Sequence, residues 1–108
     1  MDRRTRERAR LWLPVEVAEL DAGVAVSHDA SETGLLLVAS SELAVGARLH
    51  IAFRVPPEAG ARVEVEVEVV RVSANDEDPH GLWPFKIAVH FVQPVTLLER
   101  YLREVSPR

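Results

Sequence analysis

The sequence has 108 residues, of which 47% are hydrophobic, so it is long enough for one hydrophobic core and too short for two. It contains no cysteine, which excludes disulfides and thiolate metal sites. The net charge of −4 conceals an asymmetry, because residues 1–10 hold five arginines against two acidic residues and carry +3, which leaves −7 on residues 11–108. An acidic body lacks the broad positive face that duplex nucleic acids require, so we expect no nucleic-acid binding.

The N-terminal arginines form the first motif. Two overlapping R-x-x-x-R patterns fit them, Arg4 with Arg8 and Arg6 with Arg10. A guanidinium group presents a planar fork of donors that suits phosphate oxygens and also the O6 and N7 acceptors of guanine. With so many charges and few apolar anchors, residues 1–12 are expected to form a flexible Arg-rich arm. The alternative is a solvated tail without a ligand.

Alternation of apolar and polar residues predicts the first strands of the body. Residues 13–20 alternate and are followed by a turn at residues 21–23, so we expect a hairpin with a return strand at residues 24–27. Residues 29–34, with the pattern D-x-S-x-x-G, then interrupt the alternation. A continuous apolar run at residues 35–38 predicts a buried strand.

Three more strands and a helix follow in the second half. Residues 49–55 alternate well, and residues 63–72 alternate until a phase slip at Val69–Val70, which is the sequence mark of a β-bulge. Residues 86–91 predict the last strand. From Pro94 the apolar residues recur with a helical period, and proline suits a first helical turn.

Six short strands with turns between them favour a small barrel, because closing the sheet removes its exposed edges. We therefore predict an all-β fold, a six-stranded antiparallel β-barrel at residues 13–92. A C-terminal α-helix is expected within residues 93–108, and the arm of residues 1–12 precedes the barrel.

In their order and spacing these features resemble the PilZ domain family, small β-barrels that bind the bacterial second messenger cyclic di-GMP. The resemblance rests on the R-x-x-x-R arm, the strand start Leu13-Pro14-Val15, the intact D-x-S-x-x-G motif, the Val45–Gly46 turn, the closing strand at residues 81–91 and the final helix. In the family the second arginine keeps a usual distance from the proline that opens the first strand. Arg8 stands at that distance from Pro14, which favours the register of Arg4 and Arg8.

The resemblance also implies a ligand site shared by the arm and the D-x-S-x-x-G motif. Arg4 and Arg8 would approach guanine and phosphate. Asp29 and Ser31 would meet the polar edge of a base. Gly34 would permit a close backbone approach or a positive φ, which a side chain would obstruct.

Secondary contacts of this site are expected from four further residues: Arg3, Arg6, Arg10 and His28. Arg3 directly precedes the preferred register, and the neighbouring position in the family influences whether one cyclic di-GMP molecule or a stacked pair is bound. We expect Arg10 at the barrel rim or exposed, and His28 exposed at a strand end. Trp12 is a candidate rim contact, whereas Trp83 is expected to pack.

The function that the resemblance implies is that of a receptor module. Binding of one ligand molecule or a stacked pair would order the arm across the barrel, and a downstream protein partner would read the changed surface. The alternative is a PilZ-fold interaction subunit with little or no nucleotide binding. It would work in pilus or motility machinery through its helix and an acidic strand face at residues 64–68.

Other functional classes find no support in the sequence. There is no nucleophile elbow, no Walker loop and no Cys–His arrangement, so we do not expect an enzyme. The four histidines lack close metal-ligand spacing, so no metal is expected. No secretory hydrophobic region, long apolar run or lipidation motif is present, and we expect a cytoplasmic protein without membrane insertion.

Overall fold

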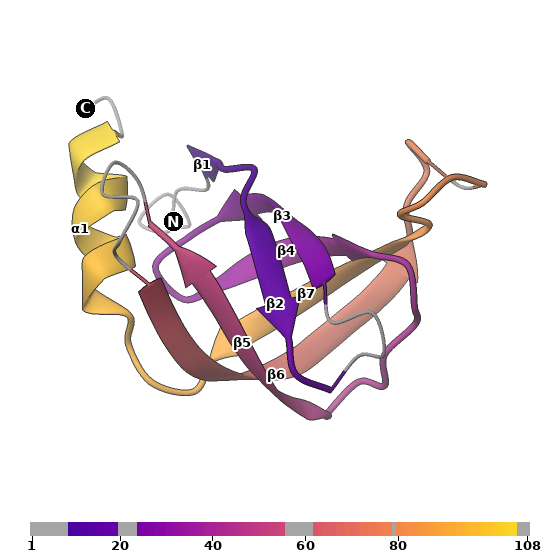
Figure 1. Ribbon diagram of the computed structural model, residues 1–108, viewed down its shortest axis with the longest axis horizontal. Coiled ribbons are helices and arrows are strands. Elements are labelled where there is room, and N and C mark those ends of the chain that lie inside the picture. Colours follow the sequence, from indigo (N-terminus) through magenta and orange to yellow (C-terminus); the bar gives the residue numbers. More distant parts are fainter. Residues whose placement is uncertain (1–8, 20–23, 56–61, 79, 106–108) are drawn as a thin grey trace, which may run out of the picture.

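The computed structural model describes residues 9–19, 24–55, 62–78 and 80–105. In these ranges the chain forms seven β-strands followed by one α-helix (Figure 1). The elements are β1 (Ala9–Arg10), β2 (Pro14–Val17), β3 (Val24–Ala30), β4 (Gly34–Ala39), β5 (Arg48–Arg54), β6 (Arg62–Ala74), β7 (Phe85–Phe91) and α1 (Thr96–Val105).

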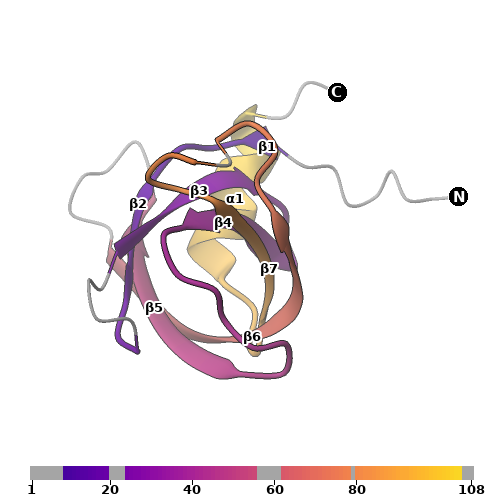
Figure 2. The same ribbon diagram turned by 90° about the vertical axis from the view of Figure 1, so that its right-hand side faces the viewer.

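Six of the strands close into an antiparallel barrel. Their order around it is β3-β2-β5-β6-β7-β4, and β4 pairs back with β3. Figure 2 looks along the barrel and shows the closed ring with α1 behind it. The predicted six-stranded antiparallel β-barrel with a C-terminal helix is therefore confirmed.

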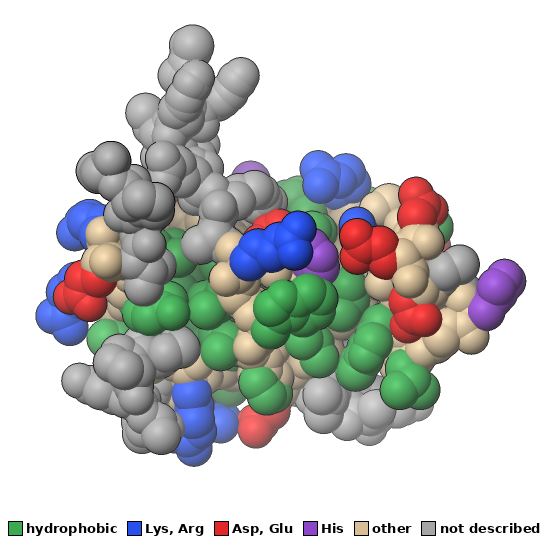
Figure 3. Space-filling model, turned by 90° about the horizontal axis from the view of Figure 1, so that it is seen from above, with side chains coloured by type: hydrophobic (Ala, Val, Ile, Leu, Met, Phe, Trp, Pro, Cys, Tyr) green, Lys and Arg blue, Asp and Glu red, His purple; other side chains and the backbone are tan. Residues whose placement is uncertain are grey.

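The short strand β1 is an addition that the sequence did not predict. It pairs with residues 29–30 of β3, while β2 pairs with residues 24–26 of the same strand. Residues 29–30 also pair with β4. Strand β3 is therefore three residues longer than predicted, because strands on either side satisfy its last backbone groups. Figure 3 shows this side of the molecule, where basic, hydrophobic and histidine side chains lie next to one another.

Strand β6 is the longest strand and bends between two partners. Its first part pairs with β5, and the rest pairs with β7. The register with β7 shifts between Val69 and Arg71, which confirms the irregularity predicted from the phase slip. The extra residue changes the direction of the strand, which allows one strand to serve two sides of a closed barrel.

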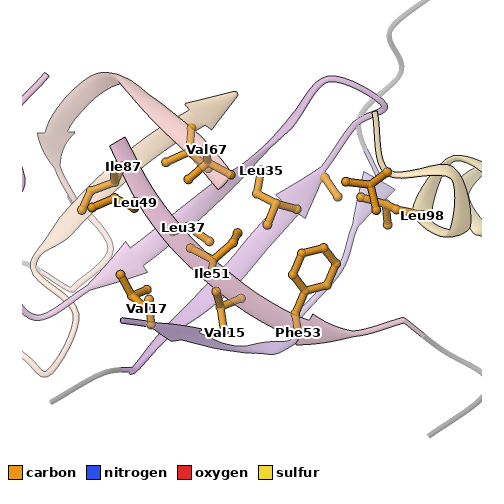
Figure 4. Packing of buried hydrophobic residues seen from close by; sticks show 14 of the residues in the cluster. Val15, Val17, Leu35, Leu37, Leu49, Ile51, Phe53, Val67, Ile87 and Leu98 are labelled. Carbon is orange, nitrogen blue, oxygen red and sulfur yellow. The ribbon is translucent and has the colours of Figure 1, made fainter. Parts of the chain in front are cut away.

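The core fills the barrel with inward side chains from alternating positions. In β2 and β5 the side chains of Val15, Val17, Leu49, Ile51 and Phe53 are buried (Figure 4). The residues between them are mostly exposed. Helix α1 lies at one end of the barrel (Figure 1) and contributes buried leucines to the same cluster.

Helix α1 is amphipathic and short. Leu98 is fully buried, which stabilises the fold by about 2 kcal/mol through its apolar transfer alone. Arg100 and Arg103 on the same helix are exposed. The helix has ten residues. Among the described residues there is no helix with the length and apolar character that crossing a membrane would need.

Candidate functional site

The D-x-S-x-x-G motif spans the end of β3, a tight turn and the start of β4. Asp29 lies within β3, opposite Arg10 on one edge and Leu36 on the other. Gly34 is the first residue of β4 and lies opposite His90 of β7. The motif is therefore held by strands on both sides.

Ser31 builds the turn of the motif. Its backbone N–H donates to the Gly34 carbonyl oxygen at 2.9 Å, and its hydroxyl oxygen accepts from the Thr33 N–H at 3.3 Å. The Ser31 and Thr33 hydroxyl oxygens also lie 3.3 Å apart. Ser31 is 5% exposed. Such local bonds are typical of serine in turns, and they leave the hydroxyl with further hydrogen-bonding capacity.

Gly34 is required by the neighbouring strand. A Cβ atom at this position would collide with the Val89 carbonyl oxygen and lie 3.1 Å from the His90 Cα atom. Among the described residues positive φ occurs at Gly46, with a value of 93°, and not at Gly34. Of the two roles expected for Gly34, the structure thus shows a close backbone approach, and it is the approach of β7.

His28 is buried, so the expectation of an exposed strand-end histidine was wrong. The strand continues to Ala30, and the Trp12 ring packs against the imidazole in a T-shaped pair, with ring centroids 4.8 Å apart and planes at 62°. The His28 residue is 8% exposed. Its Nδ1 atom lies 3.4 Å from Asp29 Oδ2, and its Nε2 atom lies 3.8 Å from Glu77 Oε1. His28 therefore connects Asp29 to the loop after β6.

Sequence reasoning missed Ser27, which fixes the chain between β1 and β2. The fully buried Ser27 hydroxyl accepts from the Leu13 N–H at 2.8 Å and donates to the Leu11 carbonyl oxygen. The Ser27 N–H donates to the Leu13 carbonyl oxygen at 2.9 Å, and the Leu11 N–H donates to the His28 carbonyl oxygen at 3.2 Å. A serine in an apolar stretch of a strand was the available signal, because a buried hydroxyl needs partners.

Among the predicted site residues, the structure brings together Asp29, Ser31, Gly34, Arg10 and His28. Arg10 is exposed, in agreement with the expectation for this residue. The other arginines of the arm, at positions 3, 4, 6 and 8, lie outside the described residues, as does the predicted turn at residues 21–23.

A shallow hollow adjoins the motif turn at the end of the barrel where α1 begins. It is lined by residues of the turn, the end of β7 and the helix: Glu32, Thr33, His90, Phe91, Val92, Pro94 and Glu99. The Phe91 N–H donates to the Thr33 carbonyl oxygen at 2.9 Å, which ties the turn to β7. The first turn of the helix therefore lies beside the motif turn.

Trp83 belongs to the loop between β6 and β7 and is half-buried, and the loop around it is internally bonded. Asn75 Nδ2 donates to the Trp83 carbonyl oxygen at 2.6 Å, and the Trp83 N–H donates to Asp78 Oδ2 at 3.1 Å. These bonds fix the backbone at Trp83, and the packing role expected for its indole stays a prediction.

The predicted acidic face on β6 is only partly solvated. Glu66 Oε2 lies 3.2 Å from Arg48 Nη1, and Glu64 Oε2 lies 3.1 Å from Arg62 Nε. On the same outer face His50 Nδ1 lies 2.7 Å from Glu19 Oε2, and the hydrogen bond and charge of Glu19 raise the pKa of His50. The acidic face is thus balanced by basic partners on β5 and β6.

No group of histidine, aspartate and glutamate side chains in the described ranges could hold a metal ion. The residues gathered near Asp29 are instead a carboxylate, a hydroxyl, an imidazole and an exposed guanidinium. The guanidinium suits an anionic group, whereas the carboxylate suits N–H donors, so the set fits a ligand that carries both.

Together the fold and this site define a class of protein: a small closed antiparallel barrel with a C-terminal helix, in which Arg10 pairs with the first residue of a D-x-S-x-x-G motif. The PilZ domain family profile matches residues 2–104. The chain belongs to the PilZ domain family. No curated protein matches the sequence.

Solved structures share the fold at low sequence identity. The inhibitor of motility MotI/DgrA from Bacillus subtilis aligns with all of this chain at 21% identity and a TM-score of 0.76. The chain spans 54% of that protein. The PilZ domain of YcgR from Escherichia coli, solved with c-di-GMP, aligns with 96% of this chain and 88% of its own length, at 14% identity and a TM-score of 0.68.

Proposed function

We propose that this protein binds cyclic di-GMP, as one molecule or a stacked pair, and signals its binding to a downstream protein partner. The observation that carries the proposal is the pairing of β1 with the motif, because Arg10 and Ala9 lie opposite Asp29 and Ala30. The last arginine of the N-terminal motif thus lies beside the D-x-S-x-x-G motif. The PilZ domain of YcgR, solved with c-di-GMP, has the same fold and supports the choice of ligand.

The chemistry of the ligand matches the residue types of the site. Cyclic di-GMP carries two phosphates and two guanines, and guanidinium groups suit both, whereas a carboxylate can accept from the N–H donors of a guanine edge. We propose Arg4 and Arg8 as the cations, with Asp29 and Ser31 at a base edge. Gly34 would serve the site indirectly, because it allows β4 to approach β7.

Four residues take a secondary part in this proposal: Arg3, Arg6, Arg10 and His28. Arg3 would favour the stacked pair by adding a guanidinium for charge and stacking. His28 would act through Asp29, whose Oδ2 atom lies 3.4 Å from its Nδ1 atom.

We also propose that the protein acts as a binding module and not as an enzyme. The family membership supports this reading, as does the chemistry near Asp29, which offers hydrogen bonds and charge. Signalling would follow from ordering of the arm against the barrel, a step whose entropic cost lowers affinity. The start of α1 lines the hollow beside the motif turn and is a route from ligand to partner.

Calorimetric titration of the full chain with cyclic di-GMP, GTP and a short DNA duplex tests this function. We expect binding heat with cyclic di-GMP, and we expect Arg4→Ala and Arg8→Ala to abolish it. Arg100→Ala is the matched control, because it removes the same charge from the exposed side of α1. No detectable cyclic di-GMP heat near physiological salt would contradict the proposal, and salt-sensitive duplex binding would indicate a nucleic-acid ligand instead.

A second function is favoured by the local roles of the motif residues. Ser31 bonds within its own turn and Gly34 accommodates β7, so both residues have structural reasons to be present without a ligand. A PilZ-fold interaction subunit with little or no nucleotide binding is therefore the alternative. The Bacillus subtilis neighbour is an inhibitor of motility, which supports motility machinery, beside pilus machinery, as a setting. A partner captured equally by wild type and the Arg8→Ala variant would favour this alternative.

A further inference from the structure

Trp12 is a large aromatic side chain that the fold holds in an exposed position. It is 56% exposed, whereas Leu11 is buried in the core and Leu13 packs against it. Trp12 itself is not part of the core cluster of the described residues. The core at this end is therefore covered by the two flanking leucines, and the indole is left at the surface.

The backbone that carries Trp12 is fixed on both sides. The buried Ser27 hydroxyl accepts from the Leu13 N–H and donates to the Leu11 carbonyl oxygen, and the Leu11 N–H donates to the His28 carbonyl oxygen. These bonds tie residues 11 and 13 to β3. The indole between them is thus presented on a preorganised segment, which lowers the entropic cost of using it for binding.

The surroundings of Trp12 contain the polar groups that a nucleobase requires. The Trp12 and His28 rings form a T-shaped pair with centroids 4.8 Å apart, and His28 Nδ1 lies 3.4 Å from Asp29 Oδ2. Arg10, two residues before Trp12, is exposed and lies opposite Asp29 in the strand pairing. Figure 3 shows hydrophobic, basic and histidine side chains next to one another on this side of the molecule.

We propose that Trp12 is a stacking platform for a guanine base of the ligand, an inference that rests on the proposed binding of cyclic di-GMP. The exposed indole face would cover one face of the base, while the Asp29 carboxylate would accept from its polar edge. Stacking tolerates any base because every base has a π-face, so Trp12 would supply affinity and Asp29 would supply preference for guanine. The loop after β6 borders this position, because Glu77 Oε1 lies 3.8 Å from His28 Nε2.

Fluorescence and calorimetry of the full chain test the platform. Trp12 and Trp83 are the two tryptophans, so Trp83→Phe leaves Trp12 as the single indole reporter. Titration of that variant with cyclic di-GMP is expected to quench the fluorescence with the midpoint that calorimetry gives. Trp12→Ala is expected to weaken the affinity about 5-fold to 150-fold, the range that loss of one base stack produces. Trp12→Phe keeps a smaller ring and should retain most of the affinity.

The outcomes separate this inference from the function on which it rests. If wild type binds cyclic di-GMP while Trp12→Ala binds equally well and the Trp83→Phe protein shows no spectral change, the platform is refuted and the receptor function stands. If wild type does not bind, both fail together. Thermal unfolding of Trp12→Ala provides the folding control: the side chain lies outside the core but contacts the His28 ring, so the midpoint should fall while unfolding stays cooperative and well above the titration temperature.

Discussion

Arg10 and Asp29 lie directly opposite each other in the adjacent antiparallel strands β1 and β3. Residues paired in this way project to the same side of the sheet, with Cβ atoms about 5 Å apart. The pairing joins the end of the Arg-rich segment to the first residue of the D-x-S-x-x-G motif. The end of one motif and the start of the other are thus connected by the backbone pairing of β1 with β3.

This pairing bears on the arginine register, which a matched pair of double variants can decide. Arg4→Ala/Arg8→Ala and Arg6→Ala/Arg10→Ala remove the same charge from the same segment. We expect the first to lose cyclic di-GMP binding by more than about 100-fold, because two charge-assisted contacts are removed, and the second to lose about tenfold or less. Calorimetry measures both affinities, and a greater loss in the second variant would assign the site to the other register.

Ser27→Ala should destabilise the barrel although it removes a single oxygen atom. The Leu13 N–H and the Leu11 carbonyl oxygen both lose their partner, and an unsatisfied buried group costs about 1–3 kcal/mol. Urea unfolding followed by circular dichroism gives the change in the free energy of unfolding. Ser73→Ala on the exposed side of β6 is the control, expected to change it by less than about 0.5 kcal/mol. Equal values for the two variants would contradict the role of Ser27.

Most of the barrel could be predicted from the sequence, because inward and outward residues alternate in strands such as β5 and the phase slip at Val69 marks the bulge in β6. What could not be predicted depends on pairing between distant segments. The extension of β3 to Ala30 depends on its pairing with both β4 and β1, and β1 contributes two residues with no pattern of their own. The burial of His28 depends on the position of Trp12, which only the folded chain defines.

For the site, the sequence indicated a motif at residues 29–34 but did not indicate which neighbours its residues would meet. Gly34 was expected to permit a close backbone approach or to adopt a positive φ. Its position in the sequence does not indicate that β7 is the segment that lies next to it. The collision of a Cβ atom with the Val89 carbonyl oxygen appears only when the barrel closes. A glycine motif in a sequence thus indicates a close approach without indicating which group approaches.

Gly34→Ala should therefore act on stability before it acts on binding. The added methyl group meets backbone atoms of β7, which cannot rotate away, so we expect a loss of about 1–3 kcal/mol or more in the free energy of unfolding. Gly46→Ala is the comparison, because there a methyl group has open space but φ is 93°, a conformation that costs an L-residue about 1–2 kcal/mol. Chemical unfolding of both variants measures these losses.

The two glycine variants should also differ in binding. Gly34→Ala disturbs the strand that begins at the motif turn and should lower cyclic di-GMP affinity, whereas Gly46→Ala lies in the turn before β5 and should keep it. A Gly34→Ala protein with unchanged unfolding free energy but lost binding would show that the glycine serves the ligand and not the strand.

The pair of His50 and Glu19 predicts a measurable pH dependence on the outer face. The hydrogen bond and the charge of Glu19 raise the pKa of His50 above its ordinary value of 6.5, and the bond from the His50 N–H lowers the pKa of Glu19 below 4.5. The contribution of His50 to the free energy of unfolding is present below pH 6.5 and is lost as the pH rises through its raised pKa. The contribution of Glu19 to the free energy of unfolding is present above pH 4.5 and is lost as the pH falls through its lowered pKa.

Glu19→Gln tests this pair without removing its side-chain volume. In an NMR titration, with the His50 resonance assigned through a His50→Gln variant, the substitution should move the pKa of His50 down toward 6.5. Both side chains are largely exposed, so the difference in unfolding free energy from wild type should be small, largest between pH 4.5 and 6.5, and reduced by salt. If the pKa of His50 is unchanged in Glu19→Gln, the 2.7 Å contact with Glu19 is not the cause of its shift. The shift would then be due to Glu66, the other charged neighbour that raises the pKa of His50, which is still present in the variant.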